Sequence, residues 1–134
     1  MSQIANLSDV AANAEANALA ALLNSGKINI YSGTQPPNAN TALSGNTLLA
    51  QLTFGSPAFG AAAAGVITAN ATGAGTASNT GTASFARLYE SDGTTAIMDV
   101  QVGTAGAYIN LNTTAIVSGS TVSVTSFTHN VTET

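Results

Sequence analysis

The chain contains very few charged residues. Two basic and six acidic side chains stand among 134 residues, so 6% of the chain is charged, against about 25% in a typical soluble domain. Cysteine is absent, which excludes disulfides, thiolate metal sites and thiol nucleophiles. The two basic residues, Lys27 and Arg87, stand far apart in the sequence, whereas binding to phosphates requires clustered positive charge. With a net charge of −4, the chain is not expected to bind nucleic acid.

Long apolar stretches are also missing. No segment approaches the ~20 consecutive apolar residues that cross a bilayer. The first ten residues, MSQIANLSDV, have neither a positive charge nor a continuous apolar run, and a secretory signal peptide has both. We therefore expect no membrane partner and no encoded export signal.

Neutral polar residues take the place of the charged ones. Serine, threonine and asparagine together number 45, and they stand among many alanine, valine and leucine residues. Hydroxyl and amide groups form hydrogen bonds without the large desolvation cost of an ion, so a surface made of them is easily buried against another protein. The same groups are poorly suited to acid–base catalysis. The composition indicates a subunit of an assembly rather than an enzyme.

One helix is predicted, over residues 7–24. Asn6 or Ser8 can cap its start, and Gly26 can end it. Apolar residues recur along it at i, i+3 and i+4 spacing, which forms a stripe on one side. The stripe consists of Leu7, Val10, Ala11, Ala14, Ala18, Ala21 and Leu22. Another side carries Asn13, Asn17 and Asn24.

The helix allows two interpretations. It can pack on its own domain, or it can be a terminal arm that docks on a neighbouring subunit through its small alanine side chains. The arm interpretation divides the chain into a helical arm, 1–26, and a β-sandwich domain, 27–134, and it predicts that the β domain folds without the arm. The residues predicted to contact a partner are Leu7, Val10, Ala14, Ala18 and Leu22 of the stripe, with Pro36 and Pro37 of the following loop.

After the helix the pattern changes to short strands separated by turn residues. The turn signals recur about every 8–12 residues, which indicates a mainly β fold of about eight strands, an antiparallel sandwich or barrel. The segment 34–45, with two prolines, is a predicted loop, and the segment 72–81, rich in small residues, is a predicted flexible connection. The predicted strands are 27–33, 46–54, 57–60, 65–71, 83–90, 95–102, 107–112 and 120–131.

The position of Arg87 indicates which of two registers the hairpin that turns at Asp92 and Gly93 adopts. A two-residue loop would place Arg87 on the buried face. A three-residue loop over 91–93, with Gly93 in the left-handed conformation, places Leu88 inside and Arg87 outside. Burying an unpaired guanidinium costs several kcal/mol. We therefore expect the second register, with Arg87 facing outward and Asp99 as its diagonal neighbour.

The last predicted strand changes its inward-facing side. Val122 and Val124 share one face, whereas Phe127 and Val131 share the other. A regular strand has a period of two and cannot turn all four inward. We therefore predict a β-bulge near Thr125–Ser126, or a strand that passes from one sheet to another.

No constellation of residues indicates catalysis or metal binding. A nucleophilic triad would need His129, the only histidine, but neither Ser123 nor Ser126 stands in a nucleophile-elbow motif. Three acidic residues lie on one predicted hairpin, at a spacing that is not that of a calcium-binding loop. They are Glu90, Asp92 and Asp99. We predict no catalytic residue, no metal ligand and no cofactor.

Three long stretches of the chain resemble a known group of proteins. They read INIYSGTQPPNANTALSGNTLLAQLTFGSPAF, FARLYESDGTTAIMDVQVG and INLNTTAIVSGSTVSVTSFT, and they cover most of residues 28–128. The stretches resemble small virion structural proteins encoded in the head-gene clusters of tailed bacteriophages. Within that group they are most similar to the jelly-roll capsid decoration, or cement, proteins of Bordetella-type podophages.

The resemblance implies a jelly-roll-like β-sandwich that forms a dimer or trimer. It implies a subunit made in the cytoplasm of a bacterial host and located on the capsid surface of the virion, where its partner is the major capsid protein. It supplies no catalytic residues. The alternatives are a tail- or fibre-associated β-sandwich and a carbohydrate-binding adhesive module.

Overall fold

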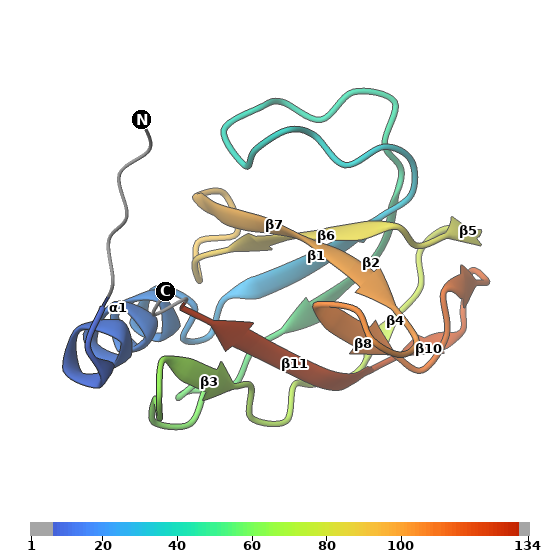
Figure 1. The fold of residues 1–134 in the computed structure, drawn as a ribbon. Coiled ribbons are helices and arrows are strands. Elements are labelled where there is room, and N and C mark those ends of the chain that lie inside the picture. The colour runs from blue at the N-terminus through green and yellow to red at the C-terminus, as the bar shows by residue number, and fades with distance from the viewer. Residues whose placement is uncertain (1–6, 132–134) are drawn as a thin grey trace.

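The computed structural model describes residues 7–131. Over these residues the fold is mainly β, with one helix, α1 (Asp9–Leu22), and eleven short strands (Figure 1). The strands are β1 (Lys27–Tyr31), β2 (Leu48–Thr53), β3 (Val66–Thr68), β4 (Gly75–Thr76), β5 (Gly81–Thr82), β6 (Phe85–Tyr89), β7 (Ala96–Gly103), β8 (Ile109–Leu111), β9 (Ala115–Ile116), β10 (Thr121–Val122) and β11 (Val124–Asn130).

Seven of the strands form one curled sheet in the order β2-β1-β6-β7-β8-β11-β3. Its neighbouring strands are antiparallel except for β7 and β8, which run parallel. Two small sheets, β10-β4 and β5-β9, complete the fold. Helix α1 lies at one end of the molecule, next to β3, and β5 and β10 lie toward the other end (Figure 1). The sequence predicts this sandwich-like, mainly β class correctly, but not the parallel pair.

Most of the predicted strands are present with shorter bounds. The strand predicted over 57–60 is wrong, because Phe59 forms only an isolated bridge there. The connection predicted to be flexible, 72–81, instead contains β4 and β5 and follows the edge of β2. The amides of Gly73 and Ser78 donate to the carbonyl oxygens of Thr53 and Leu49 at 3.3 and 2.8 Å. Backbone hydrogen bonds therefore order a segment whose side chains give no strand signal.

One hydrophobic core fills the inside of the curl. At its centre Phe54, Phe59 and Phe127 meet, with ring centroids 5.6, 6.0 and 5.2 Å apart. Around them pack aliphatic side chains from both halves of the chain, including Ile28, Ile30, Leu52, Ile67, Leu88, Ile109 and Leu111. Burial of these side chains is the main force that stabilises the sheet.

The bulge predicted in the last strand is confirmed. The pairing of β11 with β8 shifts register between Val124 and Ser126. As a result Val122 and Phe127 are both fully buried, although they stand an odd number of residues apart. The extra residue lets the chain keep its apolar side chains inside while it passes from β10 to β11.

Local contacts set the two ends of α1. The Ser8 hydroxyl caps the start and accepts a hydrogen bond from the Ala11 amide at 3.2 Å; the alternative cap, Asn6, lies outside the described residues. Ser25, with φ at +57°, turns the chain out of the helix, rather than Gly26 as predicted. A Cβ on Gly26 would stand 2.4 Å from the carbonyl oxygen of Tyr89. The glycine therefore lets β6 approach the end of the helix closely.

Helix α1 packs on its own domain, as the first of the two interpretations predicts. Ala12, Ala16 and Leu23 are fully buried, and the last two belong to the main core. The described parts of the segments 1–26 and 27–134 thus share one core. The arm interpretation predicts that residues 27–134 fold alone, whereas this shared core leads us to expect that they are unstable without the helix.

Candidate functional site

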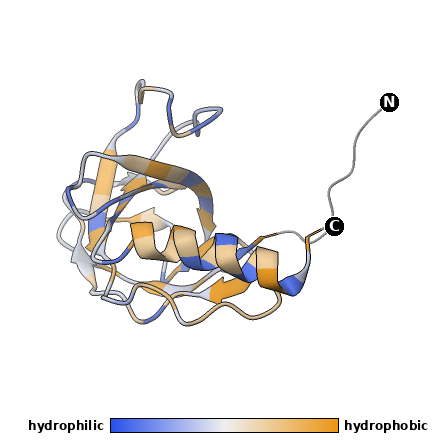
Figure 2. Cartoon of the chain, turned by 90° about the vertical axis from the view of Figure 1, so that its left-hand side faces the viewer, coloured by the Kyte–Doolittle hydropathy of each residue, from blue (hydrophilic) through white to orange (hydrophobic). Residues whose placement is uncertain are grey.

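The apolar stripe predicted on α1 faces away from the core. Val10 is 80% exposed and Leu22 is 45% exposed. Residues of a helix follow one another at about 100°, so the stripe lies opposite the buried side chains of Ala12 and Ala16. Figure 2 looks onto this helix and shows that much of its ribbon has the colour of apolar residues. We call this stripe the outward helix face; Val10, Ala14, Ala18, Ala21 and Leu22 are exposed in it, and Leu7 and Ala11 are half-buried.

The row of asparagines on α1 and just after its end fastens the helix to the segment 58–65. The side-chain oxygens of Asn13, Asn17 and Asn24 accept hydrogen bonds from the backbone amides of Gly65, Ala62 and Ala58 at 2.9, 3.1 and 2.8 Å. The sequence shows that these asparagines share a side of the helix but gives no sign of what they bind. Their hydrogen bonds hold the outward helix face in a fixed orientation.

Arg87 and Asp99 form an ion pair on the outer face of the curled sheet. They stand directly opposite each other on β6 and β7. The guanidinium donates to both carboxylate oxygens, from Nε at 2.7 Å and from Nη2 at 2.9 Å. This hydrogen bonding raises the pKa of Arg87, against the opposing effect of its burial. The prediction is therefore correct in placing Leu88 inside, where it pairs with Met98, but wrong in making Asp99 a diagonal neighbour, because Asp99 pairs directly with Arg87.

The prediction that Arg87 faces solvent is wrong. Its side chain is 6% exposed and that of Asp99 is 2% exposed, because the loop between β1 and β2 covers them. The guanidinium also donates to the carbonyl oxygens of Thr41 and Asn38, at 2.8 and 3.4 Å. Hairpin parity predicts the face on which Arg87 lies, but not a distant loop that folds over that face.

The loop between β1 and β2 projects from the sheet and is anchored at both ends (Figure 1). Asn46 donates from Nδ2 to the carbonyl oxygens of Ser32 and Thr34, at 2.9 and 3.1 Å. Arg87 holds the middle of the loop. Between these anchors the loop encloses an open hollow of about 250 Å³.

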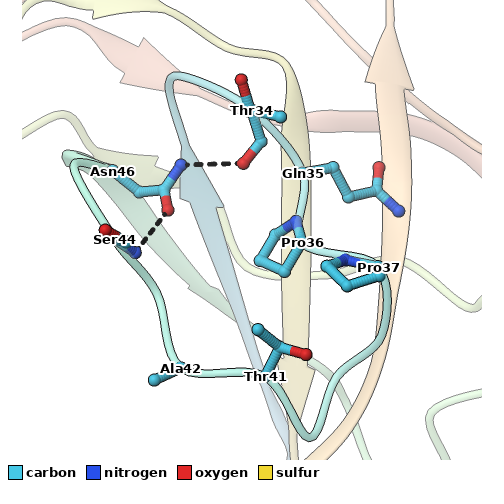
Figure 3. Close-up of a pocket in the computed structure, with 8 residues that line it drawn as sticks. All are labelled: Thr34, Gln35, Pro36, Pro37, Thr41, Ala42, Ser44 and Asn46. Atoms are coloured by element: carbon cyan, nitrogen blue, oxygen red, sulfur yellow. Dashed lines mark hydrogen bonds between the residues drawn. The ribbon is translucent and has the colours of Figure 1, made fainter.

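The two prolines predicted as contact residues line this hollow (Figure 3). The other lining residues are Thr34, Gln35, Thr41, Ala42, Ser44 and Asn46. None of the lining residues carries a charge, so the hollow offers hydroxyl, amide and apolar groups alone. Pro37 is exposed and Pro36 is half-buried. The structure thus places the two predicted contact regions, α1 and this loop, on separate parts of the surface.

The three acidic residues of the hairpin do not converge. Asp99 binds Arg87, and Asp92 binds the backbone of its own turn, where its carboxylate accepts hydrogen bonds from the amides of Thr94 and Thr95 at 2.9 Å each. Gly93, with φ at +73°, has the predicted left-handed conformation. Between residues 7 and 131 no group of three or more histidine, cysteine, aspartate and glutamate side chains could hold a metal ion.

The turn gives a pH-dependent prediction. Hydrogen bonds from the Thr95 hydroxyl, the Thr95 amide and the Thr94 amide lower the pKa of Asp92 from 3.8 to about 2. A lowered carboxyl pKa means that the stabilisation of the turn is present above pH 3.8 and is lost as the pH falls through about 2. An NMR titration of the side chain should give this value, and a Thr95→Val variant should raise it toward 3.8. Titration of the unchanged protein at the ordinary value would contradict these hydrogen bonds.

His129 contacts Tyr108 rather than a serine. The Tyr108 hydroxyl is hydrogen-bonded to Nδ1 of His129, and burial lowers the pKa of the imidazole. Ser126 lies on the opposite side of β11 and accepts a hydrogen bond from Asn110 at 2.9 Å. The amide of Ser123 donates to Asn112 at 3.1 Å. Over residues 7–131 the hydrogen bonds therefore do not join His129 to either serine.

Comparison with known proteins gives no relative for this chain: no protein family, no curated protein and no solved structure matches it. Within the part of the chain that the structure describes, no helix has the length and apolar character needed to span a bilayer.

Proposed function

We propose that this chain is a structural protein of a bacteriophage particle, a capsid decoration subunit bound to the outer surface of the head. Its partner is the major capsid protein, and the subunit acts as a dimer or trimer. The resemblance of residues 28–128 to such proteins is the starting point. The observation that carries the proposal is the uncharged projecting loop, held in place by buried Arg87.

A decoration subunit must bury parts of its surface against several neighbours. Residues 28–86 contain no charged residue, and they include the whole projecting loop. The end of the molecule near β5 and β10 (Figure 1) is built from the segments 75–85 and 112–123, which are also free of charge. Neutral hydroxyl and amide groups lose little on desolvation when they find hydrogen-bond partners. Such a surface suits repeated protein contacts.

The anchored loop suits the same role. Because Arg87 and Asn46 fix its shape, little conformational freedom is lost when it binds. Each contact of this size is weak alone, but a subunit that binds several capsid proteins at once gains affinity from multivalency. A rigid β domain with a projecting neutral loop therefore supports capsid binding.

The tyrosines give little support to the alternative of a carbohydrate-binding module. Tyr31 is 7% exposed and Tyr89 is half-buried, so neither offers an open ring to a sugar. Tyr108 is 37% exposed and is in contact with His129. An aromatic platform for sugar binding needs an accessible ring face.

Quantitative mass spectrometry of purified particles tests the proposal. In a density gradient of lysed host cells, the chain should sediment with filled heads, in a fixed molar ratio to the major capsid protein. Particles that lack tails should retain it. Presence in tailed particles alone would instead show a tail protein, and absence from all particles would refute a virion role.

Light scattering of the purified chain should show a dimer or trimer, and a monomer at micromolar concentration would contradict self-association.

A further inference from the structure

Helix α1 is apolar on two opposite sides. Its inner side, with Ala12, Ala16 and Leu23, is fully buried. Its outer side, the outward helix face, exposes two of its three large side chains, Val10 and Leu22, and Leu7 is half-buried. A helix that packs on one protein surface normally has one apolar side, which faces that surface. Of the four large apolar side chains exposed in the described residues, two belong to this one helix face.

We propose that the outward helix face docks on another protein, at an apolar surface edged by at least one basic side chain. The inference rests on the proposed function, which makes the major capsid protein this partner. The asparagine contacts of α1 hold the helix rigidly against the domain. The face is therefore presented in one orientation and needs no ordering on binding.

The charges of α1 determine the character of the partner. The helix contains two acidic residues, Asp9 and Glu15, and no basic residue. At 100° per residue, Glu15 lies beside Leu22 at the edge of the outward helix face. A basic side chain on the partner would pair with this carboxylate, whereas an acidic one would repel it. Charge complementarity at the rim of an interface favours the correct partner in this way.

The same charges argue against a second copy of this chain. Glu15 stands next to the midpoint of Asp9–Leu22. A two-fold axis through the middle of an antiparallel helix pair would therefore bring the two Glu15 side chains together, with no basic residue of α1 to neutralise them.

The area of the outward helix face is also small, because 14 residues make a helix about 21 Å long and about 10 Å wide. One side of it buries far less than the roughly 800 Å² per partner of a stable complex, so this contact requires the support of others.

A membrane surface fits the helix poorly. Helices that lie in a lipid interface usually carry lysine and arginine on their polar side. The polar residues of α1 are asparagines, which bind the protein itself, and two acids. An anionic bilayer would repel these acids.

Binding to empty shells of the major capsid protein from the same genome tests the inference. A Val10→Asn, Leu22→Asn variant should bind the shells at least about tenfold more weakly than the unchanged chain, because two apolar side chains lose their burial. The control is Ala105→Asn, since Ala105 is also exposed but lies in the loop between β7 and β8, outside the surfaces proposed to contact the capsid. It should bind like the unchanged chain. Glu15→Lys should weaken binding more than Glu15→Gln, and all variants should keep the melting temperature and oligomeric state of the unchanged protein.

Each other outcome identifies a different error. Equal binding by the double variant would overturn the docking role of α1 and leave the decoration function intact. If the unchanged chain does not bind the shells, the decoration function is overturned, and the major capsid protein is not the partner of the outward helix face. If the double variant loses its oligomeric state, the occupant is a second copy. If the unchanged chain binds phosphatidylcholine–phosphatidylglycerol vesicles and the double variant does not, the occupant is a membrane. Either the loss of oligomeric state or this vesicle binding would overturn the inference.

Discussion

An Asp99→Asn variant should lose about 3–5 kcal/mol of unfolding free energy, the usual cost of removing one partner of a buried ion pair. The substitution keeps the shape of the side chain but leaves the Arg87 guanidinium charged and without its counter-ion. Both side chains are almost inaccessible, 6% and 2% exposed, so water cannot take the place of the lost carboxylate. Chemical denaturation followed by circular dichroism measures the loss.

A double variant, Arg87→Met with Asp99→Leu, is the matched control. It removes both charges and keeps apolar volume at both positions, a replacement that is often neutral or stabilising for a buried pair. It should therefore be clearly more stable than Asp99→Asn alone. A loss below about 1 kcal/mol in the single variant is typical of an exposed pair and would contradict the burial of this one.

The double variant also tests whether Arg87 fixes the shape of the loop between β1 and β2 independently of its effect on stability. Without its guanidinium, position 87 cannot donate to the carbonyl oxygens of Thr41 and Asn38. Amide hydrogen exchange in the segment 34–46 should then become faster, while exchange in β6 and β7 stays slow. Under the proposed function this variant should fold and yet bind capsid shells more weakly.

Replacing Leu23 with alanine should destabilise the protein by about 2–5 kcal/mol, as for other large side chains removed from a core. Leu23 is fully buried at the end of α1 and packs in the main core. The adjacent Leu22 is 45% exposed, so Leu22→Ala should change stability by no more than about 0.5 kcal/mol. The two variants differ by one position and by nothing in chemistry, which makes each the control for the other.

This pair also decides between the two interpretations of the helix. If α1 is part of the domain, only the Leu23 variant unfolds at lower denaturant concentration, and residues 27–134 alone are unstable. If the segment 1–26 is an independent arm, both variants are as stable as the unchanged protein and residues 27–134 fold alone. The burial of Ala16 and Leu23 leads us to expect the first result.

The alternation of side chains between the two faces of a strand predicts local features of the fold well. The position of Arg87 correctly places Arg87 on the outer face and Leu88 inside, because a one-residue slip would exchange the two faces of the hairpin. It does not predict the register shift between Leu88 and Tyr89. The bulge after Val124 follows from the mismatch between Val122 and Phe127, which no regular strand can bury together. In both places the deciding residues lie close together in the sequence, so the sequence contains the whole argument.

Contacts between distant segments could not be predicted in this way. Nothing near Arg87 in the sequence shows that Thr41 lies above it. The helix is a second example, because a helix with apolar residues on two opposite sides does not reveal which side is inside. The buried side is the one with Ala12 and Ala16, whose small side chains let the backbone of α1 approach β3. The choice depends on the shape of the surface that receives the helix, and that surface comes from the rest of the chain.

Electron cryomicroscopy of the virions from the genome that encodes this chain tests the central claim most directly. We expect density for the curled sheet on the outside of the head, with the outward helix face or the projecting loop against the major capsid protein. Density for this fold on the tail, or heads that carry no such density, would contradict a capsid decoration function.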